Sequence, residues 1–346
     1  MTQTLARPLS PLPTVHRAGL DVALGLRPRI EAFATDVVRR GLGNVFLLGS
    51  GGGLLTHEGL QYLLEQRSTQ FPVFALSANE FIYRAPALLG ERSLVVLASN
   101  TGSTPEVVAA ARFAKERGAT VASVTKKPDS PLAGASDVAW TYGDDKGVGD
   151  PKEFMLAILG LALLRETGVL DPEAYEAHLA TLQALPDALL DACRESETLN
   201  ARIAAELAGA PVIYVIGAGP NNGTAYCLAM CFLQEMQWKH AASFDSAEFL
   251  HGAMEVVTEE TAVIQYLGEE PTRPIDERAK AFLQKYSRRA FFVDSRDLTL
   301  PGIKPSMRPF ASHFALDAIM SRLAQHFEAA TGHDLETRRY MFKVDY

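Results

Sequence analysis

The segment that most limits the possible folds runs from Ser93 to Arg117, because a short polar loop there joins a strand to an amphipathic helix. Residues 93–98 are apolar enough for a strand that is covered on both faces. Residues 105–117 have apolar side chains at helical spacing, and Gly118 follows as a stop signal. A covered strand followed by a helix is typical of a parallel sheet with helices on both faces.

This unit recurs along the chain and predicts an α/β fold with two doubly wound parallel-sheet domains in tandem. In the first half we expect strands from Val45 and over 71–77, 93–98, 120–125 and 138–142, with helices over 28–40, 79–85, 105–117, 131–135 and 153–166. In the second half we expect strands from Val212 and over 261–266 and 290–293, with helices ending near Lys239 and over 275–286 and 311–330.

These segments predict a first domain over 28–170 and a second over 209–346 that includes a C-terminal tail. Residues 1–27 are expected to form an N-terminal arm that docks on a neighbour, rather than a domain. Residues 171–208 contain no strand pattern and predict a helical bridge, in which Pro186 is expected to break the helix.

Side-chain donors crowd the loop between the strand at 93–98 and the helix at 105–117. They are Ser99, Asn100, Thr101, Ser103 and Thr104. Unpaired N–H groups and the positive end of the helix dipole add to them at a helix start. A capped helix is the simpler interpretation, but it needs only one of these side chains. The loop therefore predicts a site for a phosphate monoester, and without GxxxxGK[ST] it is not a nucleotide P-loop.

The matching position in the second half has the opposite chemistry. Leu267 to Pro271 contains the two carboxylates of Glu269 and Glu270 and no hydroxyl, so it would repel a phosphate. We therefore expect one half to hold the anion and the other to do a different task, with a phosphorylated ligand bound near the domain interface.

Composition excludes several classes of function. The formal net charge is −8 and no Lys/Arg run is present, which argues against nucleic-acid binding. No apolar run is long enough to span a membrane, and the Pro-rich N-terminus is unlike a signal peptide. The three cysteines form no CxxC, so we expect a reducing, cytoplasmic location. No metal-ligand spacing such as HExxH occurs, and the lone Gly49-x-Gly51 is weak as a dinucleotide motif, so no cofactor is expected.

Glu235 is the candidate general base. It sits near the end of an apolar helix beside Leu233, Met236 and Trp238, and a carboxylate in such surroundings has a raised pKa. A solvated helix face explains the same spacing equally well. His251 precedes a glycine, as an exposed turn residue often does, and Glu248 either caps the following helix or orients a ligand.

Over residues 30–346 the chain resembles the tandem SIS (sugar isomerase) domain proteins, which have flavodoxin-like domains. The resemblance rests on Ser99–Thr104, the turn Gly49–Gly53, Val148–Lys152, the pair Glu235 and His251, and the tail Thr337–Val344. Within that family, Glu235–Trp238, Glu248–Gly252 and the tail resemble fructosamine 6-phosphate deglycases of the fructoselysine and fructose-aspartate type. They resemble the isomerase domain of glucosamine-6-phosphate synthase less closely.

The resemblance implies a role for each matching residue. Ser99, Asn100, Thr101 and Thr104 would hold the sugar phosphate, and Glu235 would move a proton between C1 and C2. His251, reaching the site from a partner subunit, would assist ring opening, and Lys343 would fold over the substrate. Further substrate contacts are expected from Ser50, Gly51, Ser103, Lys152 and Glu248. The sequence departs from the family at Gly53, which replaces a hydroxyl residue, at Asn100, where Gln is frequent, and at Asp150-Pro151.

These roles imply an enzyme that releases glucose 6-phosphate and an amine from a phosphorylated fructosamine by enaminol chemistry. A shared site implies at least a homodimer. An aldose–ketose isomerase or an aminosugar-phosphate deaminase would use the same two residues. A non-catalytic phosphosugar sensor is a further alternative, although such sensors often have a DNA-binding helix pair, for which the acidic chain shows no basic segment.

Overall fold

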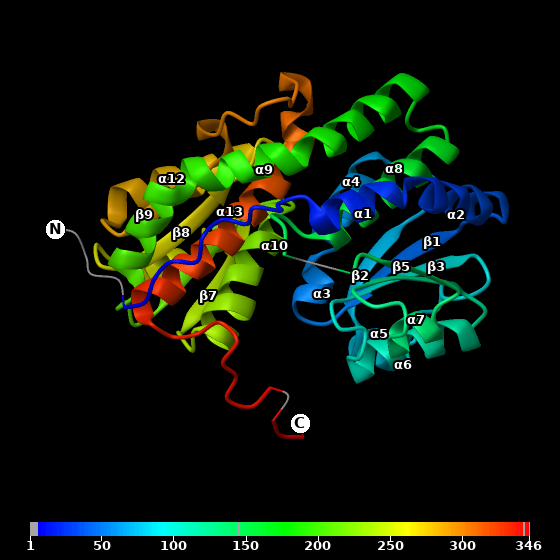
Figure 1. Cartoon of the computed structure of the whole chain (residues 1–346), viewed down its shortest axis with the longest axis horizontal. Coiled ribbons are helices and arrows are strands. Elements are labelled where there is room, and N and C mark those ends of the chain that lie inside the picture. Colours follow the sequence, from blue (N-terminus) through cyan, green and yellow to red (C-terminus); the bar gives the residue numbers. More distant parts are fainter. Residues whose placement is uncertain (1–5, 144–145, 342, 346) are drawn as a thin grey trace. The chain divides into compact units, whose positions relative to one another are not determined.

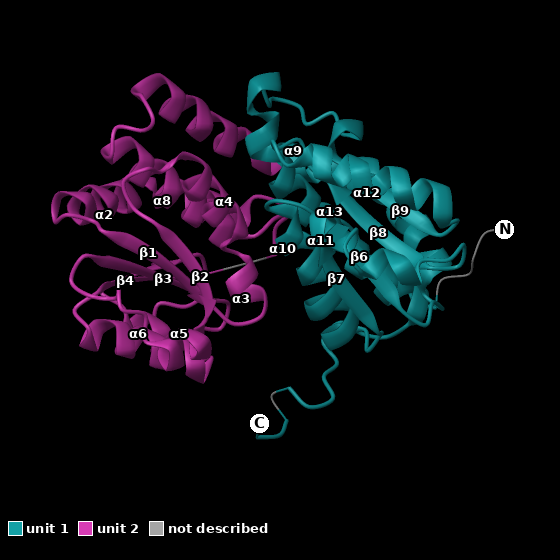
Figure 2. Cartoon of the chain, turned by 180° about the vertical axis from the view of Figure 1, so that it is seen from behind, with its two compact units in different colours: residues 1–12, 187–346 teal, residues 13–186 magenta. Residues whose placement is uncertain are grey.

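The computed structural model describes residues 6–143, 146–341 and 343–345, and the chain divides into two compact units. Unit 2 consists of residues 13–186, and unit 1 consists of residues 1–12 together with 187–346 (Figure 2). The predicted domain boundaries at 28, 170 and 209 remain predictions. Within the segment expected to be an arm, residues 18–25 form helix α1 of unit 2, and Ala6 hydrogen-bonds to Ala329 in unit 1.

Unit 2 contains a five-stranded parallel sheet (Figure 1). Its strands are β1 (Asn44–Gly49), β2 (Val73–Ser77), β3 (Ser93–Ser99), β4 (Thr120–Thr125) and β5 (Val138–Thr141). The order is β2-β1-β3-β4-β5, and every neighbouring pair is parallel. The strand order therefore reverses between β1 and β3, which is where α/β sheets of this order bind their ligands.

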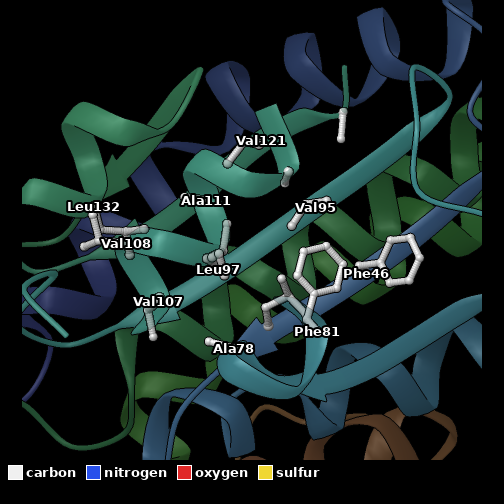
Figure 3. Packing of buried hydrophobic residues seen from close by; sticks show 14 residues of the cluster. Phe46, Ala78, Phe81, Val95, Leu97, Val107, Val108, Ala111, Val121 and Leu132 are labelled. Atoms are coloured by element: carbon white, nitrogen blue, oxygen red, sulfur yellow. The ribbon is translucent and has the colours of Figure 1, made fainter. Parts of the chain in front are cut away.

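Helices cover both faces of this sheet (Figure 1). They are α1 (Ala18–Gly25), α2 (Arg27–Arg39), α3 (Gly52–Leu55), α4 (Glu58–Arg67), α5 (Ala78–Arg84), α6 (Pro105–Glu116), α7 (Pro131–Ala135) and α8 (Pro151–Glu166). Between the sheet and α5, α6 and α7 lies a core in which Phe46 and Phe81 pack with ring centroids 5.3 Å apart (Figure 3). Each large apolar side chain buried there contributes about 1.5–3 kcal/mol. This packing fixes the start of α6 against the end of β3.

Unit 1 contains a smaller parallel sheet with the same arrangement. Its strands are β6 (Ile213–Gly217), β7 (Ala241–Asp245), β8 (Ala262–Leu267) and β9 (Ala290–Asp294), in the order β7-β6-β8-β9. The helices are α10 (Asn221–Tyr226), the π-helix η1 (Cys227–Met236), α11 (Ser246–Phe249), α12 (Arg273–Tyr286) and α13 (Arg308–Thr331), with short 3₁₀ turns η2 (Ala253–Val256), η3 (Ser295–Asp297) and η4 (Pro305–Met307). The predicted α/β class with two parallel sheets in tandem is confirmed.

Three local predictions were wrong or incomplete. Helix α9 (Pro172–Leu207) continues through Pro186, where a break was expected, because buried Leu182, Leu185 and Leu189 outweigh the lost hydrogen bond. Strand β7 was not predicted, since Ala-Ala-Ser has little strand propensity and the strand lies at a sheet edge. The expected α-helix ending near Lys239 changes to a π-helix at Cys227. No described helix has both the length and the apolar character needed to cross a membrane.

The loop after β8 explains how unit 1 differs from unit 2. Glu270 is buried, and its carboxylate accepts hydrogen bonds from Asn221 Nδ2 at 3.1 Å and Ser312 Oγ at 2.8 Å. Glu269 pairs with Arg308 at 2.7 Å. A Cβ atom on Gly268 would lie 1.7 Å from Glu270 Oε2, so the turn fits tightly around this carboxylate. The sheet position that is polar and open in unit 2 is therefore filled in unit 1 by a carboxylate of its own chain.

The buried Glu270 predicts a pH-dependent stability. Burial raises the pKa of Glu270 to about 7, so the folded state keeps a proton that the unfolded chain releases near pH 4.5. The stability that depends on the protonated Glu270 carboxyl is therefore fully present below pH 4.5 and is lost as the pH rises through about 7. Glu270→Gln removes this titration while retaining an acceptor oxygen. The melting temperature of the variant relative to the wild type should rise by about 5 °C or more between pH 5 and pH 8.

Differential scanning fluorimetry of both proteins across this range measures the effect. A difference in melting temperature that stays constant with pH would show that Glu270 does not carry the titration. Burial also raises the pKa of Asp276 to about 7, and the Glu270 charge adds to that rise, so the comparison measures the titration of Glu270 together with its effect on Asp276.

Candidate functional site

The loops after β1 and β3 meet at the point where the strand order of unit 2 reverses. A Cβ atom on Gly53, in α3 just after β1, would lie 2.5 Å from the carbonyl oxygen of Ala98 in β3. The backbone of α3 therefore approaches β3 so closely that only glycine fits. The absence of a hydroxyl side chain at Gly53 has a packing reason, since a side chain there would push α3 away from the sheet.

The hydroxyl side chains of the loop 99–104 bond mainly to one another. Ser99 Oγ lies 3.3 Å from Thr104 Oγ1 and accepts a hydrogen bond from the Gly102 amide at 3.1 Å. Ser103 Oγ donates to Thr101 Oγ1 at 2.8 Å. Thr104 is the N-cap residue of α6 and makes no side-chain capping bond. The hydroxyls at 101, 103 and 104 are therefore not used to stabilise the helix start.

Gly102 gives this loop its shape. Its φ of +65° lies in the left-handed region, and a Cβ atom would lie 2.4 Å from Ser130 Oγ and 2.6 Å from Thr125 Oγ1. The carbonyl of Gly102 accepts from the Leu132 amide at 2.9 Å, which ties the loop to α7. Asn100 and Thr101 are exposed on this fixed turn, while Ser99 is buried beneath it. The exposed part of the loop thus consists of uncharged donors on a rigid backbone.

A second group of side chains joins the start of α8 to this loop. Tyr142 donates its hydroxyl proton to Asn100 Oδ1, which leaves the Asn100 amide N–H₂ as a donor. Lys152 Nζ lies 5.5 Å from the centre of the Tyr142 ring and 2.8 Å from Asp150 Oδ2. Burial lowers the pKa of Lys152, but the Asp150 carboxylate outweighs it and the net shift is upward. Lys152 is therefore a permanently charged cation in the same group as Asn100.

The remaining predicted residues of unit 2 lie at the other loop. Ser50 and Gly51 follow β1 directly, and Gly51 has a φ of +53° before α3 begins. Both residues lie at the carboxyl end of β1, and the loop 99–104 lies at the carboxyl end of the neighbouring β3. The fold of unit 2 thus brings Ser50, Gly51, Lys152 and the loop 99–104 to one end of its sheet.

Glu235 lies in unit 1, one residue before the end of the π-helix η1. Its carboxylate is half-buried and accepts a 2.9 Å hydrogen bond from Arg338 Nε in the C-terminal tail. Burial raises the pKa of Glu235, and the Arg338 guanidinium opposes that rise. Trp238 follows with a φ of +52°, a strained conformation for a bulky residue. π-helices and strained residues both occur often at functional sites, so the geometry around Glu235 is unusual for a solvated helix face.

The other predicted residues of unit 1 are exposed. His251 and Glu248 lie on one turn after β7, joined by a 2.9 Å bond from the His251 amide to the Glu248 carbonyl. Glu248 lies within the short helix α11, which Asp245 caps, and the 3₁₀ turn η2 that follows has Gly252 at its N-cap and no side-chain capping bond. Lys343 is exposed and donates through Nζ to the Arg338 carbonyl at 2.5 Å. Unit 1 therefore brings Glu235 and the Lys343 segment together through Arg338, whereas no described contact joins His251 to Glu235.

Two residues of these groups, Tyr142 and Arg338, were not predicted as site residues. Tyr142 directly follows β5, the strand next to β4, which was a usable signal, because the ends of parallel strands gather at one sheet edge. Arg338 belongs to the tail motif, but its contact with Glu235 spans 103 residues and no local pattern reveals it. Among the described residues, no cluster of three or more His, Cys, Asp or Glu side chains could hold a metal ion.

Comparisons with known proteins identify the family of this chain. The SIS domain family matches residues 42–144. Fructosamine deglycase FrlB of Bacillus subtilis (strain 168) is 33% identical over 92% of this chain and 97% of its own length. Fructoselysine 6-phosphate deglycase of Escherichia coli (strain K12) is 26% identical over 90% of this chain and 89% of its own.

The solved structures include a B. subtilis protein provisionally described as a phosphosugar isomerase. It is 29% identical, covers 94% of this chain and 99% of its own, and superimposes with a TM-score of 0.88. The similarity to FrlB over nearly the whole chain and the match to the domain family together establish the family of this protein. The chain belongs to the SIS-domain family of sugar-phosphate deglycases and isomerases.

Proposed function

We propose that this enzyme is a fructosamine 6-phosphate deglycase, which splits a phosphorylated fructosyl amine into glucose 6-phosphate and the free amine. In this proposal unit 2 binds the phosphate and unit 1 transfers the proton. The deglycases to which the chain is similar support the reaction, and the two groups of side chains support the division of roles.

Phosphate binding is assigned to Ser99, Asn100, Thr101, Ser103 and Thr104, with Ser50, Gly51 and Lys152 beside them. Uncharged donors and backbone amides at a helix start bind a phosphate dianion without a large desolvation cost. Lys152 supplies positive charge close to Asn100, while its bond to Asp150 keeps the local charge balanced.

Proton transfer is assigned to Glu235. Its carboxylate removes a proton from C1 of the open-chain ketoamine. The C–H electron pair forms a C1=C2 double bond while the C2=O π bond breaks and its oxygen takes up a proton, which gives the enaminol. Return of a proton to C2 gives the imine of glucose 6-phosphate, which water hydrolyses to the aldehyde and the amine. Partial burial suits this role, because it raises the basicity of the carboxylate toward that needed for a carbon acid.

His251, Glu248 and Lys343 complete the proposed site. The resemblance to the family implies that His251 reaches the site from a partner subunit, and the exposure of His251 and Glu248 is compatible with such an arrangement. We therefore propose a homodimer or larger assembly in which His251 assists ring opening. Lys343 would close over the substrate from the tail.

One observation carries the proposal more than any other. The loop after β3 presents open hydroxyl donors, whereas its counterpart after β8 is filled by the buried carboxylate of Glu270. Incubation of the purified protein with fructoselysine 6-phosphate and a coupled assay for glucose 6-phosphate tests the reaction. Release of lysine together with glucose 6-phosphate is expected. Interconversion of fructose 6-phosphate and glucose 6-phosphate alone would make it an isomerase, and release of ammonia from an aminosugar phosphate would make it a deaminase.

Replacing the proposed base should abolish turnover without abolishing binding. A positioned general base contributes about 10²- to 10⁴-fold, so Glu235→Gln should lower kcat by that factor. The dissociation constant for fructoselysine 6-phosphate, measured by calorimetry, should stay within about threefold, because the phosphate site is unchanged. Glu260→Gln, an exposed carboxylate of the same unit, is the matched control and should retain full activity. Near-normal turnover by the Glu235 variant would remove Glu235 from the mechanism.

Removing one loop hydroxyl should weaken phosphate recognition. Thr104→Val keeps the shape of the side chain but deletes a donor to a charged ligand, which costs about 1.5–3 kcal/mol. KM and the inhibition constant of inorganic phosphate should both rise about tenfold or more, with little change in kcat. Thr120→Val is the control, because Thr120 begins β4 and therefore lies at the edge of the sheet opposite the loop 99–104. Equal phosphate inhibition of wild type and Thr104→Val would show that this hydroxyl does not contact the anion.

A further inference from the structure

The C-terminal tail packs against the end of the π-helix that carries Glu235. Gln237 Nε2 donates to the His333 carbonyl at 2.7 Å, and Thr331 Oγ1 donates to Gln237 Oε1 at 2.7 Å. The Arg339 guanidinium lies 4.3 Å from the centre of the Trp238 ring, and the Trp238 and His333 rings lie 4.5 Å apart. Several independent contacts therefore hold the tail in place around Glu235.

Arg338 is the tail residue that touches the proposed base. Its Nε donates to Glu235 Oε1 at 2.9 Å, and its side chain is only 13% exposed. Its Nη1 donates to the carbonyls of Leu335 at 2.5 Å and Thr337 at 3.2 Å. The guanidinium is thus fixed by the tail backbone on one side and directed at the carboxylate on the other.

We propose that Arg338 is a positioning residue, which holds the Glu235 carboxylate ionised and in one orientation and makes proton transfer depend on the folded tail. The inference rests on the proposed function, in which Glu235 is the base. It assigns a role to Arg338 that neither the loop 99–104 nor Lys343 can fill, because Arg338 is the described residue that hydrogen-bonds to Glu235.

The charges around Glu235 favour this role. Its carboxylate is 24% exposed, and burial of that degree drives it toward the protonated form, in which it cannot accept a proton from carbon. Among the described residues, the Arg338 guanidinium opposes this rise in the pKa of Glu235. The other nearby cations have different partners: Arg339 lies over Trp238, Lys239 bonds to the Ala208 carbonyl, and Lys343 bonds to the Arg338 carbonyl.

Titration of the Glu235 carboxyl tests the inference without any substrate. Protein labelled with ¹³C at glutamate side-chain carboxyls gives one signal that is lost in Glu235→Gln, and this loss assigns Glu235. In Arg338→Met the midpoint of that signal should move up by about one pH unit or more, the lower end of the effect of a neighbouring opposite charge. Arg338→Lys should restore part of the shift. Arg339→Met removes the neighbouring arginine and should leave the midpoint unchanged.

The same variants separate positioning from simple support of the fold. If Glu235 is the base, the acidic limb of the kcat/KM profile for fructoselysine 6-phosphate should move up by the same amount in Arg338→Met. KM at high pH should change less than kcat. Circular dichroism and melting temperature identify any variant that fails to fold, in which case Arg338→Lys carries the test with a smaller shift.

The possible failures are distinguishable. An unmoved carboxyl midpoint in folded Arg338→Met or Arg338→Lys overturns the inference whether or not the enzyme is a deglycase. Full turnover by Glu235→Gln, combined with a shifted midpoint, instead overturns the choice of base in the proposed function. Equal shifts in Arg338→Met and Arg339→Met would show a general loosening of the tail and would also overturn the specific role of Arg338.

Discussion

The reversal of strand order between β1 and β3 is the constraint on which the candidate site depends. Because these strands lie side by side and parallel, their following loops emerge at the same edge of the sheet. The close approach of Gly53 to Ala98 keeps the two loops together. The hydroxyl donors of the loop after β3 and the glycine turn after β1 therefore lie at the same edge of the sheet.

The two units share one sheet arrangement but differ in the side chains of the loop that follows the matching strand, β3 in unit 2 and β8 in unit 1. In unit 2 the loop after β3 has short hydroxyl side chains, which bond to one another and are exposed at Thr101 and Ser103. In unit 1 the loop after β8 has the longer side chains of two glutamates, and the Glu270 carboxylate accepts hydrogen bonds from Asn221 and Ser312. The Glu270 carboxylate is therefore buried and hydrogen-bonded within its own unit, whereas the hydroxyls of Thr101 and Ser103 are exposed. The fold alone therefore does not specify binding, and a few loop residues decide it.

Much of the fold could be predicted from local pattern. Strands such as β3 and β4 and helices such as α6 and α7 follow from continuous apolar runs, proline at helix starts and glycine stops. Strand β7 could not be predicted because Ala241 and Ala242 carry no strand preference and pairing with β6 decides their conformation. The π-helix was equally hidden, since an apolar helix with no polar face looks the same at either pitch. Contacts between distant residues, such as Arg338 with Glu235, lie beyond any local pattern.

The glycine at position 53 has a consequence for how this corner of the protein can change. Even the smallest side chain at this position would collide with the Ala98 carbonyl at 2.5 Å. Real Cβ contacts essentially never come so close, so backbone would have to shift, at an energetic cost, to admit one. Any side chain at position 53 therefore requires the backbone of α3 or of β3 to move as well. A substitution at this glycine would thus disturb the loop after β3 and not only the turn that contains it.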